Sequence, residues 1–214
     1  FDFGDRSLDF FEVAPGAGLG GFAVSPDHKR AYGVRNAIDQ HEFYVFDLEQ
    51  KRLLRKVAYK GRPRTSLKVS TDGETVYVSF GSFGLYAYDF DGNLAWRRIL
   101  GPYESQHGLG ASPIVFEDLL IVPNDQDGPS SILALNRRTG RTVWSQLRKF
   151  KSGRTSYATP LIIREKNLPP QLICVSGESG ISSLDPYTGR QNWATEAFPL
   201  RTVPAGGHRS CVRT

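Results

Sequence analysis

Several features are missing from this sequence of 214 residues, and each absence excludes a class of protein. Methionine is absent and the first residue is Phe1, so we expect this end to be processed or excised. No positively charged segment followed by an apolar stretch opens the chain, so no signal peptide is expected within it. No apolar run approaches the roughly 18 residues of a membrane-spanning helix. We therefore expect no membrane span.

Cysteine is scarce, with only Cys174 and Cys211, which lie 37 residues apart. Neither belongs to a CxxC pair or to a Cys and His spacing that is typical of zinc ligands. A zinc site of familiar type and a disulfide-rich scaffold are therefore excluded. Cys174 lies in the apolar segment QLICV, where a small buried side chain is expected. A single disulfide between the two cysteines stays open.

Acidic residues are missing from the most basic stretch of a chain whose formal net charge is +5. The basic residues of this stretch are Arg137, Arg138, Arg141, Arg148, Lys149, Lys151 and Arg154. Such a stretch can bind an anionic partner such as nucleic acid. It carries no nucleic-acid-binding motif, so we interpret it as solvated turns and outer strand faces. No nucleic-acid partner is expected.

Helical patterns are also missing, because no ten-residue segment combines the helical spacing of apolar residues with helix caps. Short runs rich in Val, Ile, Leu and aromatic residues, bounded by Gly, Pro, Asn or Asp, predict strands instead. The clearest set covers residues 112–116, 119–123, 131–136 and 141–147. The sequence therefore predicts an all-β protein with tight turns.

Tryptophan occurs only three times, and each one ends a similar segment. The segments are AYDFDGNLAW (87–96), ALNRRTGRTVW (134–144) and SLDPYTGRQNW (183–193). Aligning the residue before each turn places Asp47, Asp89, Asn136 and Asp185 in register, at separations of 42, 47 and 49 residues. A repeat of about 40–50 residues has the length of one four-stranded propeller blade. The first repeat is expected to carry Leu54 where the others carry Trp.

The turn within these segments has a defined chemistry. The side chain of Asn136 or Asp185 can accept a hydrogen bond from the backbone two residues on. Gly140 and Gly189 supply the positive φ that closes a tight hairpin. A Trp on the outgoing strand buries a large apolar surface, and its indole N–H requires an acceptor. We therefore expect each Trp to seal the contact between neighbouring blades.

This segment resembles the tryptophan-docking motif of the PQQ-like β-propeller repeats, A-x-N-x-x-T-G-x-x-x-W. The third repeat meets it in full, with Ala134, Asn136, Thr139, Gly140 and Trp144. The fourth repeat has Ser183 at the first position and then Asp185, Thr188, Gly189 and Trp193, and the second reaches Trp96 through a shortened turn. Such repeats occur in quinoprotein alcohol dehydrogenases and in the propeller lipoprotein of the outer-membrane assembly machinery. Residues 80–128 also look like those of secreted bacterial PQQ-repeat proteins.

The resemblance implies a β-propeller of four recognisable four-stranded blades, as part of a seven- or eight-bladed ring. We predict an N-terminal segment at 1–18, blades at about 19–60, 61–104, 105–150 and 151–198, and an irregular tail at 199–214. Four blades supply half a ring, so we expect a fragment or an unusually small or open propeller. Open blade edges would favour self-association.

Two classes of function agree with this resemblance. In quinone-dependent dehydrogenases, PQQ and Ca²⁺ lie at the ring axis with an Asp base, a stacking Trp and often a disulfide between adjacent cysteines. This sequence has no adjacent cysteines, and its tryptophans all belong to the repeat. We therefore predict a non-catalytic scaffold without a cofactor, extracytoplasmic by resemblance, that binds a protein partner or a small ligand on a propeller face. The alternatives are a fragment of a PQQ-dependent or other propeller enzyme, whose active site lies in other blades, and a purely structural block.

The best polar candidates for a ligand-binding loop are Gln106, His107, Asp125, Gln126 and Asp127. The segment NDQDG contains the first half of a calcium-loop pattern, but the required Glu is absent and strands flank it. An EF-hand is thus excluded, and no metal ligand or catalytic residue is predicted. The competing interpretation is a loop that forms hydrogen bonds with its own backbone.

Overall fold

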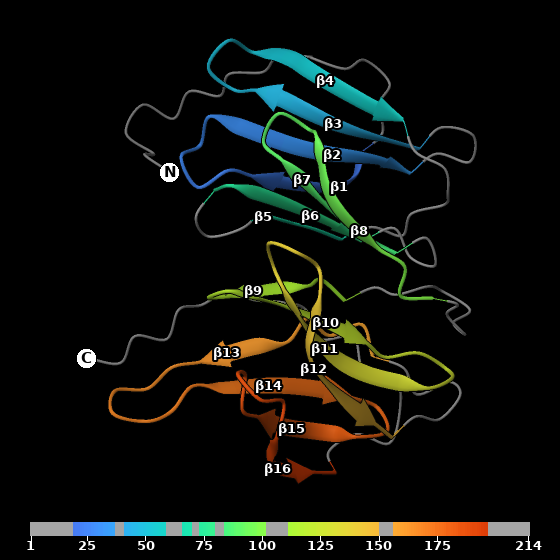
Figure 1. The fold of residues 1–214 in the computed structure, drawn as a ribbon, viewed down its shortest axis with the longest axis vertical. Helices are drawn as coiled ribbons and strands as arrows, with labels where there is room; N and C mark the ends of the chain where they lie inside the picture. The colour runs from blue at the N-terminus through green and yellow to red at the C-terminus, as the bar shows by residue number, and fades with distance from the viewer. Residues whose placement is uncertain are drawn as a thin grey trace, which may run out of the picture.

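The computed structural model describes residues 19–36, 41–58, 66–69, 73–79, 84–101, 111–149 and 156–196. Within these ranges, sixteen strands form four antiparallel sheets of four strands, and no helix is present. Figure 1 shows the sheets following one another along the molecule, from β1–β4 at one end to β13–β16 at the other. The predicted all-β class with four four-stranded sheets is confirmed.

Each sheet is built from four consecutive strands. The first sheet contains β1 (Leu19–Val24), β2 (Arg30–Asn36), β3 (His41–Asp47) and β4 (Arg52–Ala58). The second contains β5 (Ser66–Val69), β6 (Thr75–Ser79), β7 (Leu85–Asp89) and β8 (Leu94–Arg98). The third contains β9 (Ile114–Phe116), β10 (Leu119–Asn124), β11 (Ser130–Asn136) and β12 (Thr142–Arg148). The fourth contains β13 (Leu161–Ile163), β14 (Gln171–Ser176), β15 (Gly180–Leu184) and β16 (Gln191–Thr195).

Because strand order follows chain order, the turns of each sheet alternate between two ends. In the third and fourth sheets, the loops β10–β11 and β14–β15 lie at the end where β12 and β16 finish; we call this the first face. The turns β9–β10, β11–β12, β13–β14 and β15–β16 lie at the opposite end, which we call the second face. Side chains from neighbouring sheets can therefore meet on either face.

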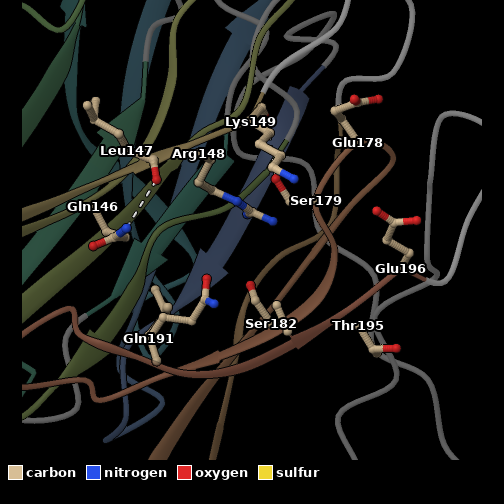
Figure 2. Close-up of a pocket in the computed structure, with 12 residues that line it drawn as sticks. Gln146, Leu147, Arg148, Lys149, Glu178, Ser179, Ser182, Gln191, Thr195 and Glu196 are labelled. Carbon is tan, nitrogen blue, oxygen red and sulfur yellow. Dashed lines mark hydrogen bonds between the residues drawn. The ribbon is translucent and has the colours of Figure 1, made fainter.

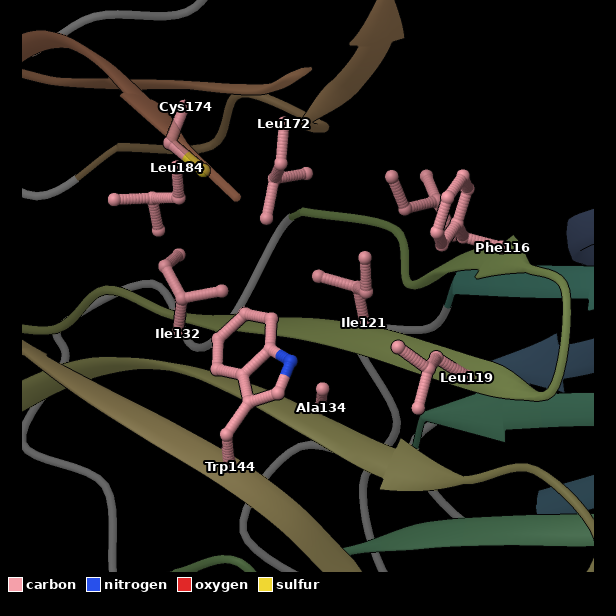
Figure 3. Packing of buried hydrophobic residues seen from close by; sticks show 10 residues of the cluster. Phe116, Leu119, Ile121, Ile132, Ala134, Trp144, Leu172, Cys174 and Leu184 are labelled. Atoms are coloured by element: carbon pink, nitrogen blue, oxygen red, sulfur yellow. The ribbon is translucent and has the colours of Figure 1, made fainter. Parts of the chain in front are cut away.

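Apolar residues pack between the sheets in three clusters. Tyr32 and Val76 belong to the cluster between the first and second sheets, and Tyr77 and Leu120 to that between the second and third. The third cluster joins the third and fourth sheets through Trp144 and its neighbours (Figure 3). Successive residues of one strand thus face different neighbouring sheets, as the alternation of side chains in a strand requires.

The two end sheets differ from the inner ones. Ala31, Tyr44 and Phe46 form a fourth buried cluster in the first sheet, and the described apolar residues packed against it are Leu48 and Leu53, from the β3–β4 turn and β4. At the other end, all five residues of β16 are exposed. Each end sheet therefore has one face that no other described sheet covers.

A register shift recurs in every pair of third and fourth strands. The residue before the shift pairs with Trp96, Trp144 or Trp193 in the later sheets, and with Arg55 in the first sheet. Arg55, and not Leu54 as expected, therefore occupies the tryptophan position of the first sheet. The cause is spacing, because Arg55 lies eight residues after Asp47, as Trp144 does after Asn136.

Candidate functional site

Trp96 and Trp144 each connect one sheet to the next. Trp96 Nε1 donates a hydrogen bond of 2.9 Å to the carbonyl oxygen of Arg137, and Trp144 Nε1 donates one of 3.0 Å to that of Pro186. Both acceptors lie in the turn between the third and fourth strands of the following sheet. We call the Trp side chain together with this turn an inter-sheet joint.

Glycine is required where each indole ring lies on the turn. Gly140 and Gly189 have φ values of 69° and 73°, in the left-handed region. A Cβ atom on Gly140 would lie 2.7 Å from Cε3 of Trp96, and one on Gly189 would lie 2.5 Å from Cε3 of Trp144. The glycines therefore serve both the backbone turn and the close approach of the ring.

The side chain that opens each turn accepts backbone hydrogen bonds. Asn136 Oδ1 accepts from the backbone N–H groups of Arg138 and Thr139 and from the Thr139 hydroxyl, at 3.0–3.1 Å. Asp185 Oδ1 accepts from the backbone N–H groups of Tyr187 and Thr188 at 2.8 and 3.2 Å. These bonds fix the turn that the preceding Trp contacts.

The joint between the first and second sheets uses a different side chain. Arg55 Nη1 donates to the carbonyl oxygen of Asp91 at 2.9 Å and to Asn93 Oδ1 at 2.7 Å. Its Cδ would lie 3.0 Å from a Cβ atom on Gly92, so the aliphatic part of Arg55 occupies the place of the ring. Lys51 has a φ of 54° in the turn before Arg55, where the later turns have glycine.

Trp193 has no following sheet among the described residues. Its side chain is 44% exposed, and Nε1 donates to Oε1 of Gln171 within the same sheet at 3.3 Å. Trp193 thus holds the same position in its sheet as Trp144 without an inter-sheet joint in the described part of the chain.

The predicted ligand-binding loop is only partly described. Gln106 and His107 lie outside the described residues. Gln126 is buried and bonded within its own loop: its N–H donates to Ser130 Oγ at 3.0 Å and its Nε2 to the carbonyl oxygen of Pro129 at 2.6 Å. Asp127 is partly exposed. The side chain of Gln126 therefore holds the loop shape.

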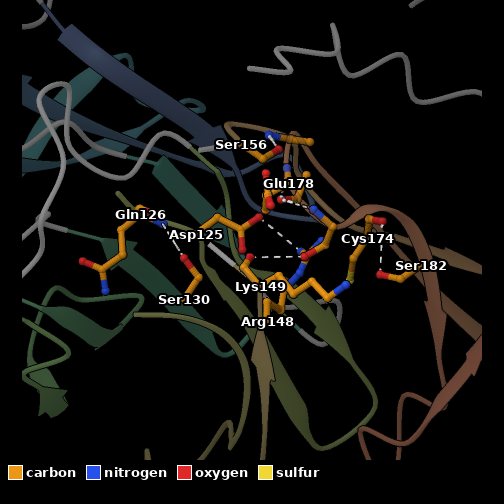
Figure 4. Close-up of polar contacts among 12 residues, drawn as sticks. Asp125, Gln126, Ser130, Arg148, Lys149, Ser156, Cys174, Glu178 and Ser182 are labelled. Carbon is orange, nitrogen blue, oxygen red and sulfur yellow. Dashed lines mark hydrogen bonds and ion pairs between the residues drawn. The ribbon is translucent and has the colours of Figure 1, made fainter. Parts of the chain in front are cut away.

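Asp125 points the other way, into an ion pair with Arg148 at the end of β12 (Figure 4). Asp125 Oδ2 lies 3.2 Å from Arg148 Nη1, and both side chains are only 6% exposed. Asp125 Oδ1 and Arg148 Nη2 are buried and have no hydrogen-bond partner among the described residues. Burial raises the pKa of Asp125 to about 6, although the Arg148 guanidinium acts to lower it. A buried pair with unsatisfied atoms is costly unless a further group completes it.

Cys174 of β14 is buried close to this pair and has no disulfide partner among the described residues. Burial raises the pKa of its thiol to about 12, against the effect of Arg148. The thiol therefore stays protonated and packs as an apolar group, as the sequence indicated. Cys211 lies outside the described residues.

A pocket of about 310 Å³ lies between the third and fourth sheets on the first face (Figure 2). The third sheet contributes residues 146–149 of β12 and its end. The fourth sheet contributes Glu178 and Ser179 from the β14–β15 loop, together with residues of β15 and β16. Ser179 Oγ donates to the carbonyl oxygen of Lys149 at 3.2 Å, which ties the two walls together.

The interpretation of the basic stretch as solvated is wrong for Arg137 and Arg148, whose side chains are buried. Trp144, Gln146 and Arg148 alternate along β12 and share the face toward the fourth sheet. This two-residue period was the signal in the sequence that could have identified Arg148 as buried. No signal in the sequence identified its charge partner Asp125, because the β10–β11 loop approaches β12 only after folding.

The described residues contain no group of three or more His, Cys, Asp or Glu side chains that could hold a metal ion. They also contain no helix long and apolar enough to cross a membrane.

The fold has relatives among solved structures. BamB from Moraxella catarrhalis superposes with a TM-score of 0.68 at 20% identity, over 84% of this chain and 54% of that one. A europium-containing methanol dehydrogenase superposes with a TM-score of 0.61 at 13% identity, over 82% of this chain and 40% of that one. The quinohemoprotein alcohol dehydrogenase from Comamonas testosteroni superposes with a TM-score of 0.55 at 16% identity, over 80% of this chain and 34% of that one. The chain therefore spans about half of the BamB chain, or less of the enzymes, and shares a propeller fold with them.

A comparison with curated protein sequences gives no significant match. A family model described as outer membrane protein assembly factor BamB matches residues 39–203, which is most of the chain. The match agrees with the recurring Trp segments and with the four sheets. The chain belongs to the PQQ-repeat β-propeller family that this model represents.

Proposed function

We propose that this chain is a non-catalytic part of a propeller scaffold that binds a protein partner in an extracytoplasmic compartment. The observation that carries the proposal is the use of the tryptophans. Trp96 and Trp144 are held in inter-sheet joints, and Trp193 lies on the outermost strand of its sheet. The rings of Trp96 and Trp144 are thus occupied by the turns of the following sheets, which supports a structural use of these tryptophans. The family match to an outer-membrane assembly factor supports a role in binding proteins.

A preorganised aromatic cluster on the second face suits such a partner. Tyr187 is 48% exposed and packs edge-on against Phe116 with ring centroids 5.1 Å apart. Its hydroxyl donates to Glu117 Oε1 at 3.1 Å, and Arg164 Nη2 lies 3.1 Å from the same oxygen. The Arg164 guanidinium also lies 4.9 Å from the centre of the Phe116 ring. Tyr and Arg side chains held in this way are typical anchors of protein interfaces.

Photo-crosslinking in a bacterial cell envelope tests the scaffold. A photoreactive phenylalanine analogue at Tyr187 is expected to give a specific adduct with an envelope protein. The same analogue at Val143, an exposed position on the outer strand β12, is the control and should give none. An adduct with a component of the outer-membrane assembly machinery would support the proposal. Absence of an adduct at Tyr187, or equal adducts at both positions, would contradict it.

The second candidate function is a PQQ-dependent dehydrogenase fragment, which the likeness to two such enzymes favours at the level of fold. Calorimetric titration of the chain with PQQ and Ca²⁺ tests this alternative directly. Saturable binding would favour the enzyme and overturn the non-catalytic proposal. Heats equal to those of dilution would count against the enzyme and favour the scaffold.

A further inference from the structure

The pocket between the third and fourth sheets combines walls of opposite charge. Arg148 and Lys149 extend from the end of β12, whereas Glu178 and Glu196 come from the fourth sheet. Figure 2 shows Arg148 and Lys149 near the middle of the group, with Glu178 and Glu196 to the right of them. No ion pair joins Lys149 or Glu196 to another described residue, and both residues line the pocket.

Arg148 supplies the second observation. Its side chain is 94% shielded from solvent, since 6% is exposed, yet Nη2 has no acceptor among the described residues. The guanidinium is planar and presents paired N–H donors that match a carboxylate. Asp125 occupies only Nη1, so a second carboxylate entering beside Arg148 would give Nη2 the acceptor that it lacks.

Neutral polar groups line the space between the charged walls. They come from the fourth sheet and are Ser182, Gln191 and Thr195. The volume of 310 Å³ is that of about ten water molecules, because each occupies about 30 Å³ in the liquid. A molecule of the size of an amino acid or a short dipeptide fits this volume.

We propose that this pocket binds a small zwitterion, with its carboxylate at Arg148 and Lys149 and its ammonium group at Glu196. The site lies on the first face, apart from the aromatic cluster at Tyr187 on the second. Ligand binding here would join β12 to β15 and β16 and so strengthen the contact between the third and fourth sheets. The site is independent of the proposed protein-binding role.

Three related dipeptides test the proposal with the intact chain, by NMR chemical-shift titration of the ¹⁵N-labelled protein. L-alanyl-L-alanine carries both charges, its N-acetyl derivative lacks the ammonium group, and its C-terminal amide lacks the carboxylate. The unmodified dipeptide is expected to bind saturably and to shift signals of residues around the pocket. The amide should bind about tenfold or more weakly, because a carboxylate bonded to Arg is worth more than a neutral acceptor.

Variants at exposed positions locate the two ends of the ligand. Glu196→Gln should weaken binding of the unmodified dipeptide about two- to fivefold and leave the N-acetyl derivative unchanged, as expected for an exposed ion pair. Lys149→Gln should weaken both by a similar factor. Glu165→Gln, an exposed change in the β13–β14 turn, is the matched control and should alter neither.

Three outcomes would overturn the proposal. The first is no saturable shift up to a concentration on the order of 10 mM, where even a weak specific site would be occupied. The second is equal affinity for all three dipeptides, and the third is a set of shifts away from β12, β15 and β16. The comparison of ligands does not depend on the variants, so it decides the matter even if a substitution disturbs folding.

Discussion

At the scale of single residues, Gly140 and Gly189 combine two constraints that usually occur separately. Each has a positive φ, and each lies beneath the ring of a Trp from the preceding sheet. A side chain at either position would strain the backbone and also displace the ring, which would break the hydrogen bond of the indole N–H. The inter-sheet joint therefore depends on a residue that contributes no side-chain contact of its own.

Gly189→Ala is expected to lower the free energy of unfolding by about 2–4 kcal/mol, because the new methyl group meets the rigid Trp144 ring. Gly92→Ala is the control, since its φ of 82° is similar but its nearest neighbour is Cδ of the Arg55 side chain, at 3.0 Å, and not an aromatic ring. The control should cost about 1 kcal/mol. Urea denaturation of both variants measures the difference, and equal losses would show that the ring contact contributes nothing.

The ion pair of Asp125 and Arg148 predicts a dependence of stability on pH. Burial raises the pKa of Asp125 in the folded chain to about 6, above the value of about 4 for an exposed Asp. The folded state thus binds this proton more tightly than the unfolded state. The contribution of Asp125 to stability is greatest below about pH 4 and is lost as the pH rises through about 6.

Asp125→Asn removes the titrating group and should abolish this part of the pH dependence. The free energy of unfolding, measured between about pH 4 and pH 7, should fall with rising pH more steeply in the unsubstituted chain than in the variant. Parallel profiles for the two proteins would contradict the assignment.

Single residues also show where sequence reasoning reached its limit. The Asn or Asp that opens each turn and the glycine of the later turns were predictable, because local backbone geometry and hydrogen bonding require them. Arg55 was predictable by counting from Asp47 but was missed because alignment favoured an apolar residue. The pairing of Arg148 with Asp125 was not predictable, since it depends on how the loop 125–129 folds back toward the end of β12.

At the scale of strands, β6 and β10 serve two interfaces at once. In β10, Leu119 and Ile121 pack toward the fourth sheet, whereas Leu120 and Val122 pack toward the second. This arrangement explains why the run LLIVP is apolar throughout, without the polar alternation of a half-exposed strand. The sequence predicted the strand from this run, but the run alone does not say which residues face which sheet.

Trp144 and Trp193 occupy equivalent positions on β12 and β16, yet their substitution is expected to have different costs. Trp144→Ala should lower the free energy of unfolding by about 3–5 kcal/mol, because it empties a buried site between two sheets. Trp193→Ala should cost less than about 1 kcal/mol, because Trp193 is half exposed in this chain. Denaturation at low protein concentration provides the comparison. A large loss of unfolding free energy for Trp193→Ala would mean that another surface covers Trp193 in solution.

At the scale of the whole molecule, three apolar interfaces connect four sheets in chain order. Each described sheet thus depends on its sequence neighbours, so the structure resembles a linear array in its energetics. The number of sheets and their order were predictable from the spacing of the repeats. The exposure of β16 was predictable from the same count, because no described sheet follows the fourth.

The exposed outer strand of the fourth sheet predicts self-association of the isolated chain. Light scattering at increasing concentration should show a mass that rises above the 23.8 kDa of one chain. Trp193→Ser should shift this rise to higher concentration, because it removes the largest exposed side chain of β16. Leu168→Ser, an exposed apolar residue in the β13–β14 turn, is the control. A mass of one chain at all concentrations would contradict the prediction.

The direction of the inter-sheet joints has a consequence for biosynthesis. In each described joint, the donor precedes its acceptor in the chain, with Trp96 bonded to Arg137 and Trp144 to Pro186. A ribosome therefore releases Trp96 and Trp144 before the turns that receive them. The indole ring of each stays in water until about 40 further residues have left the exit tunnel, as the separations of 41 and 42 residues require. Tryptophan emission recorded during translation should shift to shorter wavelength in two steps, one for each of these joints.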